Sequence, residues 1–470
     1  RRSTPFLAPS HRGIESHPML QNMLTTLLAL LSVLAGVAKG ARHFGNQPNV
    51  IVVLTDDQDA LLNSTAFQPV VMSEIAGKGI TFSHAFANTP VCCPSRSSLL
   101  SGRYVHNHGA RNNSLQGDCA SRSWSETVEV DSLAVHMQRA GYRTLYAGKY
   151  LNNYGFPNTG AHGAEGTAYV PPGWTDWYAL KGNSRYYNYT ISDNGKEEVH
   201  GDVYEEDYLT DVLAARALRF IQQDNDDNGS ASASASAPPG NHGDGRSSGS
   251  EQRQRKGQQQ QPFYMMIGTP AAHASFTPSP QYEATATGWR APRTPTWNQP
   301  GEDRHQTVRN VPPMNDTQIE ESDRIYRQRL GTLRSVDDMV KAILTELEES
   351  GVLDNTFIFY TADHGFHLGQ LGMGFDKRQL YETDIRVPLF VRVPAAMRRS
   401  EPDGGTIVVD SPVSHVDLAP TILDLATGGK GKYVPESWDG LSYAPLLLPD
   451  SAKEEHAAGG GGTGGRNYTL

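Results

Sequence analysis

Three aspartates follow two apolar runs of the chain, and their side chains could do chemistry together. Asp56 and Asp57 come directly after the run 48–54, and Asp363 comes shortly after the run 355–361. Adjacent carboxylates repel one another unless a cation lies between them, so Asp56 and Asp57 are candidate ligands for a hard divalent ion. The alternative is an aspartate-rich turn that caps the next helix, and for Asp59 we favour that interpretation.

The two apolar runs indicate how these acids are positioned. An unbroken run rich in β-branched residues predicts a strand buried on both faces, as in a parallel sheet. Open α/β sheets place their sites at the carboxyl ends of such strands. Two strand ends that each carry an acid can therefore close one oxygen-rich cage. Calcium fits a mostly carboxylate ligand set better than zinc does.

A thiol stands in an unusual setting between these runs. Residues 91–103 read Val-Cys-Cys-Pro-Ser-Arg-Ser-Ser-Leu-Leu-Ser-Gly-Arg. Cys92 could be a small buried apolar residue or half of a disulfide with Cys93. Vicinal disulfides are strained and rare, and packing does not explain the Pro-Ser-Arg that follows. A reactive or modified Cys92 is the better interpretation of the whole segment.

The segment matches the maturation signature of the type I sulfatases, Cys-x-Pro-Ser-Arg followed by a Leu-x-Gly-Arg-type tail. From about Pro48 to Leu447 the chain resembles the sulfatase branch of the alkaline-phosphatase-like superfamily. It is most similar to the group of N-acetylglucosamine-6-sulfatases, extracellular heparan-6-sulfatases and algal or fungal arylsulfatases. The segments that carry this likeness are 88–93, 148–152, 174–178, 186–190 and 376–382.

The resemblance implies that a formylglycine-generating enzyme oxidises Cys92 to an aldehyde. In the hydrated aldehyde, one geminal hydroxyl attacks the sulfur of a sulfate monoester, and loss of a proton from the other then expels sulfate. An ordinary serine would stay sulfated after one turnover. The implied substrate is a sulfated sugar, such as a glycosaminoglycan, or an aryl sulfate.

The resemblance also implies one divalent cation, most simply Ca²⁺, held by Asp56, Asp57, the modified Cys92, Asp363 and His364. The commonest family pattern has asparagine at the position of His364, whereas the extracellular heparan-6-sulfatases also look like Asp-His-Gly. His364 is therefore either a ligand or a hydrogen-bond partner of a ligand.

Cations for the sulfate group are implied in the same way. Arg96 would hold the aldehyde hydrate, while Lys149 and Lys377 would bind sulfate oxygens and balance the charge of the transition state. His273, which follows an apolar run at 262–267, would steady or protonate the leaving alcohol.

The base that collapses the sulfated intermediate is unassigned. Many arylsulfatases read Gly-Lys-x-His around this lysine, whereas this chain continues from Lys149 as Tyr-Leu-Asn. His106 and His108 are close enough in sequence to be considered. Either histidine could equally be structural.

Alternating apolar strands and helices predict a mostly parallel three-layer α/β/α core in one catalytic domain over 46–447. The resemblance implies that this core is alkaline-phosphatase-like. Further strands are expected at 143–148, 262–267 and 387–391, and a long amphipathic helix at 320–349.

The low-complexity composition of 224–261 predicts a disordered insertion that follows a helix ending near Gln222. The tail 448–470 is Gly-rich, and relatives continue beyond this point, which predicts a truncated C-terminal subdomain.

Charge and composition bear on location and partners. The chain has 470 residues and a net charge of −10, so no basic face is expected for nucleic acid. The upstream segment 1–42 contains an apolar run at 24–38, which is short for a membrane span and typical of a signal-peptide core. We therefore expect no transmembrane anchor, and secretion or delivery to a lysosomal or other endomembrane lumen.

Cysteines and sequons agree with that route. Conversion of Cys92 would leave Cys93 and Cys119 as a candidate disulfide. Asn-x-Ser/Thr sequons stand at Asn63, Asn112, Asn188, Asn228, Asn315 and Asn467.

Two other functions remain open. A phosphate-ester hydrolase of the same superfamily would carry serine or threonine as nucleophile and usually two zinc ions. A catalytically silent protein that binds sulfated glycans would keep the cleft without ever being matured.

Overall fold

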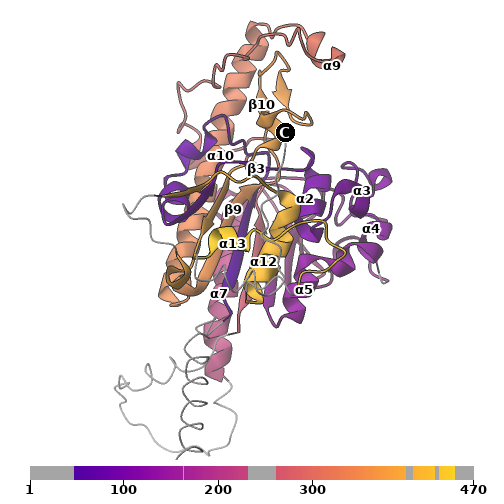
Figure 1. Cartoon of the computed structure of the whole chain (residues 1–470), viewed down its shortest axis with the longest axis vertical. Helices are drawn as coiled ribbons and strands as arrows, with labels where there is room; N and C mark the ends of the chain where they lie inside the picture. The colour runs from indigo at the N-terminus through magenta and orange to yellow at the C-terminus, as the bar shows by residue number, and fades with distance from the viewer. Residues whose placement is uncertain (1–46, 162, 231–260, 399–405, 429–432, 450–470) are drawn as a thin grey trace, which may run out of the picture. The chain divides into compact units, whose positions relative to one another are not determined.

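A large mixed sheet organises the chain in the computed structural model, which describes residues 47–161, 163–230, 261–398, 406–428 and 433–449. Among these residues its order is β13-β2-β12-β9-β1-β8-β4-β5-β6-β7 (Figure 1). The strands are β1 (Asn49–Thr55), β2 (Gly79–Phe82), β4 (Arg143–Lys149), β5 (Asp176–Leu180), β6 (Tyr189–Asp193), β7 (Lys196–His200), β8 (Phe263–Gly268), β9 (Thr356–Ala362), β12 (Leu389–Arg392) and β13 (Ile407–Val409). Two small pairs stand apart, β3 (Ala85–Phe86) with β14 (Val413–Ser414) and β10 (His367–Leu368) with β11 (Phe375–Asp376).

The centre of the sheet is parallel. β9, β1, β8, β4 and β5 pair in parallel in that order, while β12, β6 and β7 pair antiparallel with their neighbours. Every residue of β1 and β9 is buried, as expected for strands covered on both faces. The strands predicted from the apolar runs are therefore confirmed, and the carboxyl ends of the parallel strands β1, β4, β8 and β9 meet at one edge.

Helices cover both faces of the sheet, which confirms the three-layer prediction (Figure 1). Val50, Val52 and Leu54 of β1 share one core with residues of α2, α5 and α12, whereas Ile51 and Val53 share the other with residues of α7 and α10. This alternation follows from the two-residue period of a strand. The helices are α2 (Cys92–Ser101), α3 (Val105–His108), α4 (Arg122–Thr127), α5 (Leu133–Arg139), α6 (Tyr204–Asp207), α7 (Leu209–Ser230), α9 (Gln306–Arg309), α10 (Asp316–Glu349), α11 (Glu382–Ile385), α12 (Leu418–Ala426) and α13 (Ala444–Leu447).

The long helix predicted at 320–349 is α10, and it starts earlier than the apolar pattern suggested. Asn315 caps it, because its side chain accepts from the Gln318 N–H while the Gln318 side chain accepts from the Asn315 N–H. Conversely, α7 continues to Ser230, past the expected end at Gln222, so the predicted insertion begins too early. Backbone hydrogen bonds propagate a helix beyond its last apolar residue.

Other predictions fall partly outside the described residues. The upstream segment 1–42 and most of the insertion and of the tail lie there. The described residues do contain the expected disulfide between Cys93 and Cys119, and Cys92 is a free buried thiol. None of the described helices is long and apolar enough to cross a membrane.

Glycine at position 148 allows β4 and β8 to approach closely just before Lys149. Gly148 has φ +96°, and a Cβ there would lie 2.1 Å from the carbonyl oxygen of Gly268. Gly141 has a similar φ of +91°, but nothing lies within 4 Å of its Cβ position. Comparing substitutions at the two glycines therefore separates the cost of backbone strain from the cost of a steric clash.

We predict that Gly148→Ala lowers the free energy of unfolding by about 3 kcal/mol, because strain and a backbone clash add. Gly141→Ala should lower it by about 1 kcal/mol, since only the strain remains. Denaturant unfolding of both variants measures the difference. Equal losses in the two variants would contradict the close approach at Gly148.

Candidate active site

Four strand ends deliver charged or polar side chains to one place. β1 runs into Asp56 and Asp57, β9 into Asp363, β4 ends at Lys149, and the loop after β8 carries His273. The β1–β9 register pairs Thr55 with Ala362, so the acids that follow each strand are neighbours. The backbone N–H of Asp57 donates to Asp363 Oδ1 at 3.0 Å, which locks the two strand ends together.

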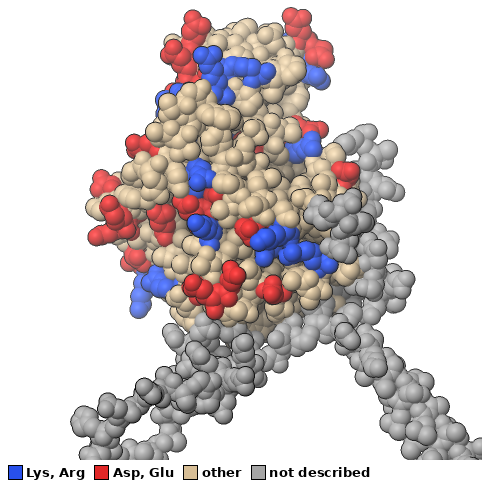
Figure 2. Space-filling model, turned by 90° about the vertical axis from the view of Figure 1, so that its left-hand side faces the viewer, with Lys and Arg blue, Asp and Glu red and all other residues tan. Residues whose placement is uncertain are grey.

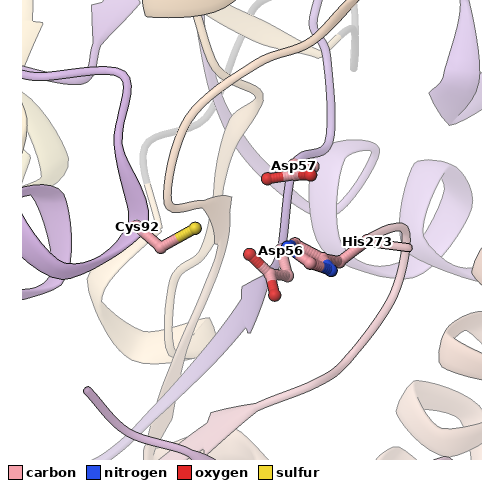
Figure 3. Close-up of side chains that lie close together, drawn as sticks. All are labelled: Asp56, Asp57, Cys92 and His273. Carbon is pink, nitrogen blue, oxygen red and sulfur yellow. The ribbon is translucent and has the colours of Figure 1, made fainter. Parts of the chain in front are cut away.

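The thiol of Cys92 completes this group from the first turn of α2. One ligand atom from each of Asp56, Asp57, Cys92 and His273 lies within 4.8 Å of the others. Figure 3 shows these four side chains close together. A second such set joins Asp56 and Cys92 to Asp363 and His364. The structure therefore brings together all five residues that the sequence predicted as metal ligands.

Two buried lysines neutralise the adjacent aspartates. Lys149 Nζ lies 2.5 Å from Asp56 Oδ2, and Lys377 Nζ lies 2.6 Å from Asp57 Oδ2. Burial alone would raise the pKa of both carboxyls, but Lys149 holds the pKa of Asp56 well below its usual range and Lys377 brings that of Asp57 to about 2. Both carboxylates are thus charged at neutral pH.

Arg96 pairs with the third carboxylate from within α2. Its Nε donates to Asp363 Oδ2 at 2.9 Å, and an Nη donates to the carbonyl oxygen of Lys149 at 2.7 Å. The side chain is 1% exposed. Arg96 therefore links the helix that carries Cys92 to the ends of β9 and β4.

The ring of His364 is oriented toward the thiol. Its Nδ1 lies 2.9 Å from the carbonyl oxygen of Gly365, so this nitrogen donates and Nε2 is the free one. Nε2 lies 3.4 Å from Cys92 Sγ and 3.4 Å from Asp57 Oδ1. A histidine held through one nitrogen and presenting the other is the usual arrangement of a metal ligand.

The residues present fit a divalent cation. Asp56 Oδ1 is buried without a hydrogen-bond partner among the described residues, and the nearest guanidinium nitrogen of Arg96 is 3.7 Å away. A buried carboxylate oxygen without a partner is costly, and a cation would supply the missing interaction. The donor set is mostly oxygen, which suits a hard ion.

His273 lies at the rim of the same group. Burial alone would lower the pKa of its imidazole, but Asp56 and Asp57 raise it above the ordinary value. Nδ1 lies 2.6 Å from the carbonyl oxygen of Ala274, which leaves Nε2 for a ligand. A ring that carries a proton near the acids can act as a general acid.

The two other histidines considered from the sequence have different surroundings. His108 is buried, with Nε2 3.0 Å from the Ser98 hydroxyl and Nδ1 accepting from the Ala110 N–H. Burial lowers its pKa to about 4. His106 is exposed and stacks on Tyr104. Neither histidine belongs to the groups around Cys92, and His108 is structural.

Asp59 closes the turn after β1 as expected, but it does not cap the next helical turn, η1 (Ser64–Phe67), whose N-cap is Asn63. Its carboxylate accepts from the Leu62 N–H at 2.9 Å and pairs with Arg329 at 2.9 Å. Arg329 is 1% exposed and also donates to the carbonyl oxygen of Asp57. The contacts of Arg329 with Asp59 and with the Asp57 carbonyl oxygen therefore hold the loop that carries Asp56 and Asp57 in place.

Sequence reasoning missed Ser184 and His415. The Ser184 hydroxyl donates to Asp56 Oδ2, which also binds Lys149. The His415 Nδ1 lies 3.0 Å from the hydroxyl of Ser95, which itself donates to the carbonyl oxygen of Asp363. Ser184 lies in a loop, and His415 begins a single 3-10 turn, η10 (His415–Asp417), directly after β14. Neither position has a charge or strand pattern, so only the recurring family segments around them offered a signal.

Comparisons with known proteins agree with this geometry. The sulfatase family profile matches residues 48–248 and 250–429, so the chain belongs to the sulfatase family. It is 41% identical over 415 residues to N-acetylglucosamine-6-sulfatase of Capra hircus, which covers 88% of this chain and 65% of that protein. For the Homo sapiens protein of the same name the identity is 40% over 449 residues, covering 95% and 70%. The chain thus spans about two-thirds of the length of these relatives.

A solved structure confirms the fold prediction. The structure of a protein in complex with its substrate D-glucosamine-2-N,6-O-disulfate superposes with a TM-score of 0.62 and 24% identity, covering 86% of this chain and 80% of that one. The alkaline-phosphatase-like architecture expected from the motifs is therefore present.

A buried carboxyl that contacts Tyr150 and Tyr169 was also missed. Glu129 accepts from the hydroxyl of Tyr150 at 2.6 Å and from that of Tyr169. Burial raises the pKa of Glu129 to about 7, although both hydroxyls act to lower it. The folded state therefore binds this proton more tightly than the unfolded state, in which the pKa is about 4.5.

We predict that the contribution of Glu129 to stability is complete below about pH 4.5 and is lost as the pH rises through 7, a change of about 3 kcal/mol. Glu129→Gln cannot titrate, so its thermal midpoint should fall less than that of the wild type between pH 5 and pH 8. If the thermal midpoints of the two proteins fell by the same amount between pH 5 and pH 8, the raised pKa of Glu129 would be contradicted.

Proposed function

We propose that this chain is a sulfuric ester hydrolase that cleaves sulfate monoesters of a sulfated sugar or an aryl alcohol. The observation that carries the proposal is the position of Cys92. The cysteine of a sulfatase maturation motif lies at the start of α2 among Asp56, Asp363 and His364, with buried cations on two sides. The packing of an apolar core would not require a thiol to lie among these charged side chains.

The sulfur of Cys92 stands for the oxygens of a formylglycine hydrate at the same position. One hydroxyl of the hydrate attacks the ester sulfur, the S–O bond to the alcohol breaks, and the alcohol leaves with a proton. Loss of a proton from the second hydroxyl then reforms the aldehyde and expels sulfate. Water restores the hydrate.

The surrounding side chains have separate roles in these steps. Lys149 and Lys377 bind the sulfate oxygens and balance the charge that develops on them. Arg96 holds the hydrate, and His273 gives the leaving alcohol its proton. The face of the molecule in Figure 2 carries acidic and basic side chains intermixed, so attraction of the anionic substrate rests on these local cations.

Asp56, Asp57, residue 92, Asp363 and His364 would hold a calcium ion. When bound, it would lower the pKa of a coordinated hydroxyl and draw electron density from a coordinated sulfate oxygen. Oxygen donors outnumber nitrogen in this set, which favours Ca²⁺ over Zn²⁺.

The names of the relatives support our proposal for the substrate and the location. Proteins named N-acetylglucosamine-6-sulfatase are 40–41% identical to the chain, which favours a sugar sulfate. A relative from Drosophila melanogaster is named an extracellular sulfatase. We infer a protein that acts outside the cell or in a lysosomal or endomembrane lumen, after maturation by a formylglycine-generating enzyme.

We predict that the tryptic peptide with residue 92 carries an aldehyde when the chain is made in a host with maturation machinery. The wild type should hydrolyse a chromogenic aryl sulfate, and Cys92→Ala should lose at least about 10³-fold in kcat. Cys92→Ser should accumulate a stable sulfated peptide, because it has no second hydroxyl. Mass spectrometry and initial rates measure these outcomes.

Other results would favour the other functions. An unmodified thiol together with retained binding of sulfated glycans would indicate a silent binder. Faster turnover of aryl phosphate than of aryl sulfate would indicate a phosphate-ester hydrolase.

We predict that removal of divalent ions by a chelator abolishes aryl sulfate turnover and lowers the thermal midpoint, and that Ca²⁺ restores both. At 100 times its dissociation constant the ion should stabilise the fold by about 3 kcal/mol. Asp363→Asn should weaken this calcium-dependent shift. Asp376→Asn is the matched control, because its side chain is 51% exposed and lies outside the ligand groups. A melting temperature insensitive to chelator and to Ca²⁺ would argue against the ion.

A further inference from the structure

Two loops pack together beside the candidate active site, one after β4 and one after β5. Asn152 Nδ2 donates to Asn183 Oδ1 at 3.1 Å, and the Gly182 N–H donates to the Tyr154 carbonyl oxygen at 2.8 Å. A Cβ at Gly182 would lie 2.8 Å from the Phe156 ring. The ring, the glycine and the amide pair therefore form one tightly built unit.

Both loops are tied to the reacting centre. The residue after Asn183 is Ser184, whose hydroxyl donates to Asp56. The residue after Asn152 is Asn153, which donates to the carbonyl oxygen of Asn113 at 2.8 Å. The side chain of Asn113 in turn accepts from the backbone N–H of Cys93 at 2.9 Å. On one side a short chain of contacts thus connects this unit with Cys93, the residue next to Cys92, and on the other side a contact connects it with Asp56.

The unit presents apolar and polar surface together. Phe156 is 43% exposed, and Asn183 is exposed. Because Asn183 Oδ1 is occupied by Asn152, the amide of Asn183 is fixed and its N–H donors remain for a ligand. An aromatic face beside an amide donor suits a sugar, since the C–H face of a pyranose packs on the ring while its hydroxyls accept hydrogen bonds.

Asn152 has a feature that packing does not explain. It is 7% exposed, and its Oδ1 is buried without a partner among the described residues. A buried amide oxygen without a partner destabilises the fold, and such costs are found where function requires a particular residue. Orienting the exposed Asn183 amide is such a function.

We infer that Phe156 and Asn183 form a subsite for the pyranose ring whose sulfate ester reaches residue 92, and that Asn152 is the positioning residue of this subsite. The inference rests on the proposed function. It names the part of the molecule that distinguishes a sugar sulfate from a simple aryl sulfate.

The test compares two substrates, N-acetylglucosamine-6-sulfate and 4-nitrophenyl sulfate, with the matured full chain. Asn183→Ala should lower kcat/KM for the sugar sulfate about 10-fold to 100-fold more than for the aryl sulfate, which has no hydroxyl for the amide. Asn152→Ala should shift the same ratio in the same direction. Phe156→Ala should raise KM for the sugar sulfate about tenfold with a smaller change in kcat. Val199→Ala, an exposed apolar residue of β7, is the control and should change neither substrate.

The outcomes separate the subsite from the activity. Asn183 is exposed, so its variant tests the subsite even where Asn152→Ala folds poorly. If Asn183→Ala and Phe156→Ala leave the sugar sulfate within about twofold, or if Asn183→Ala reduces both substrates equally, the subsite is overturned. A wild type that hydrolyses neither substrate would instead overturn the proposed function, and the subsite with it.

Discussion

The compensation of buried charge at one sheet edge is the constraint on which the rest of this structure depends. Asp56, Asp57 and Asp363 are all at most 1% exposed, and an unpaired carboxylate at such a depth would cost several kcal/mol. Each is paired with a cation from a different part of the chain, β4, the segment after β11, and α2. The sheet, the helix α2 and the segment that carries Lys377 must therefore assemble together.

This pairing also explains why the loops around the site are so firmly held. The ion pair of Asp59 with Arg329 fixes the turn after β1 to the long helix α10. The contacts of Arg96 fix α2 to two strand ends. A reaction that shifts charge is faster when the surrounding dipoles are already fixed, because they need little reorganisation. The contacts of Asp59 and Arg96 fix the groups around the site in this way.

Much of the fold could be predicted from the sequence because it depends on local patterns. Buried parallel strands are continuous apolar runs, so β1, β8 and β9 were recognisable, and the amphipathic period identified α10. The carboxyl ends of parallel strands share an edge, so the sequence already predicted that Asp56 and Asp57 lie near Asp363. The maturation motif added Cys92 and Arg96, and the family segments added the two lysines.

The remaining contacts depend on how loops cross in space, which no local pattern records. Ser184 reaches the centre from a loop, and His415 reaches it from the short 3-10 turn η10. Glu129 is buried because aromatic side chains of the core surround it, and its polar sequence neighbours do not reveal this. For His108 the sequence left a catalytic and a structural role equally open, and the structure places it outside the groups around Cys92. The end of α7 was misplaced because polar composition does not by itself stop a helix.

The complete burial of α2 limits when the proposed modification of Cys92 could take place. Every residue from Cys92 to Ser101 is inaccessible to solvent, and the next cysteine along is already joined to Cys119. A modifying enzyme would need to bind the chain around Cys92 in order to reach this thiol. The modification proposed for Cys92 would therefore have to precede the docking of this helix, and a chain that folded first would keep an unmodified thiol at this position.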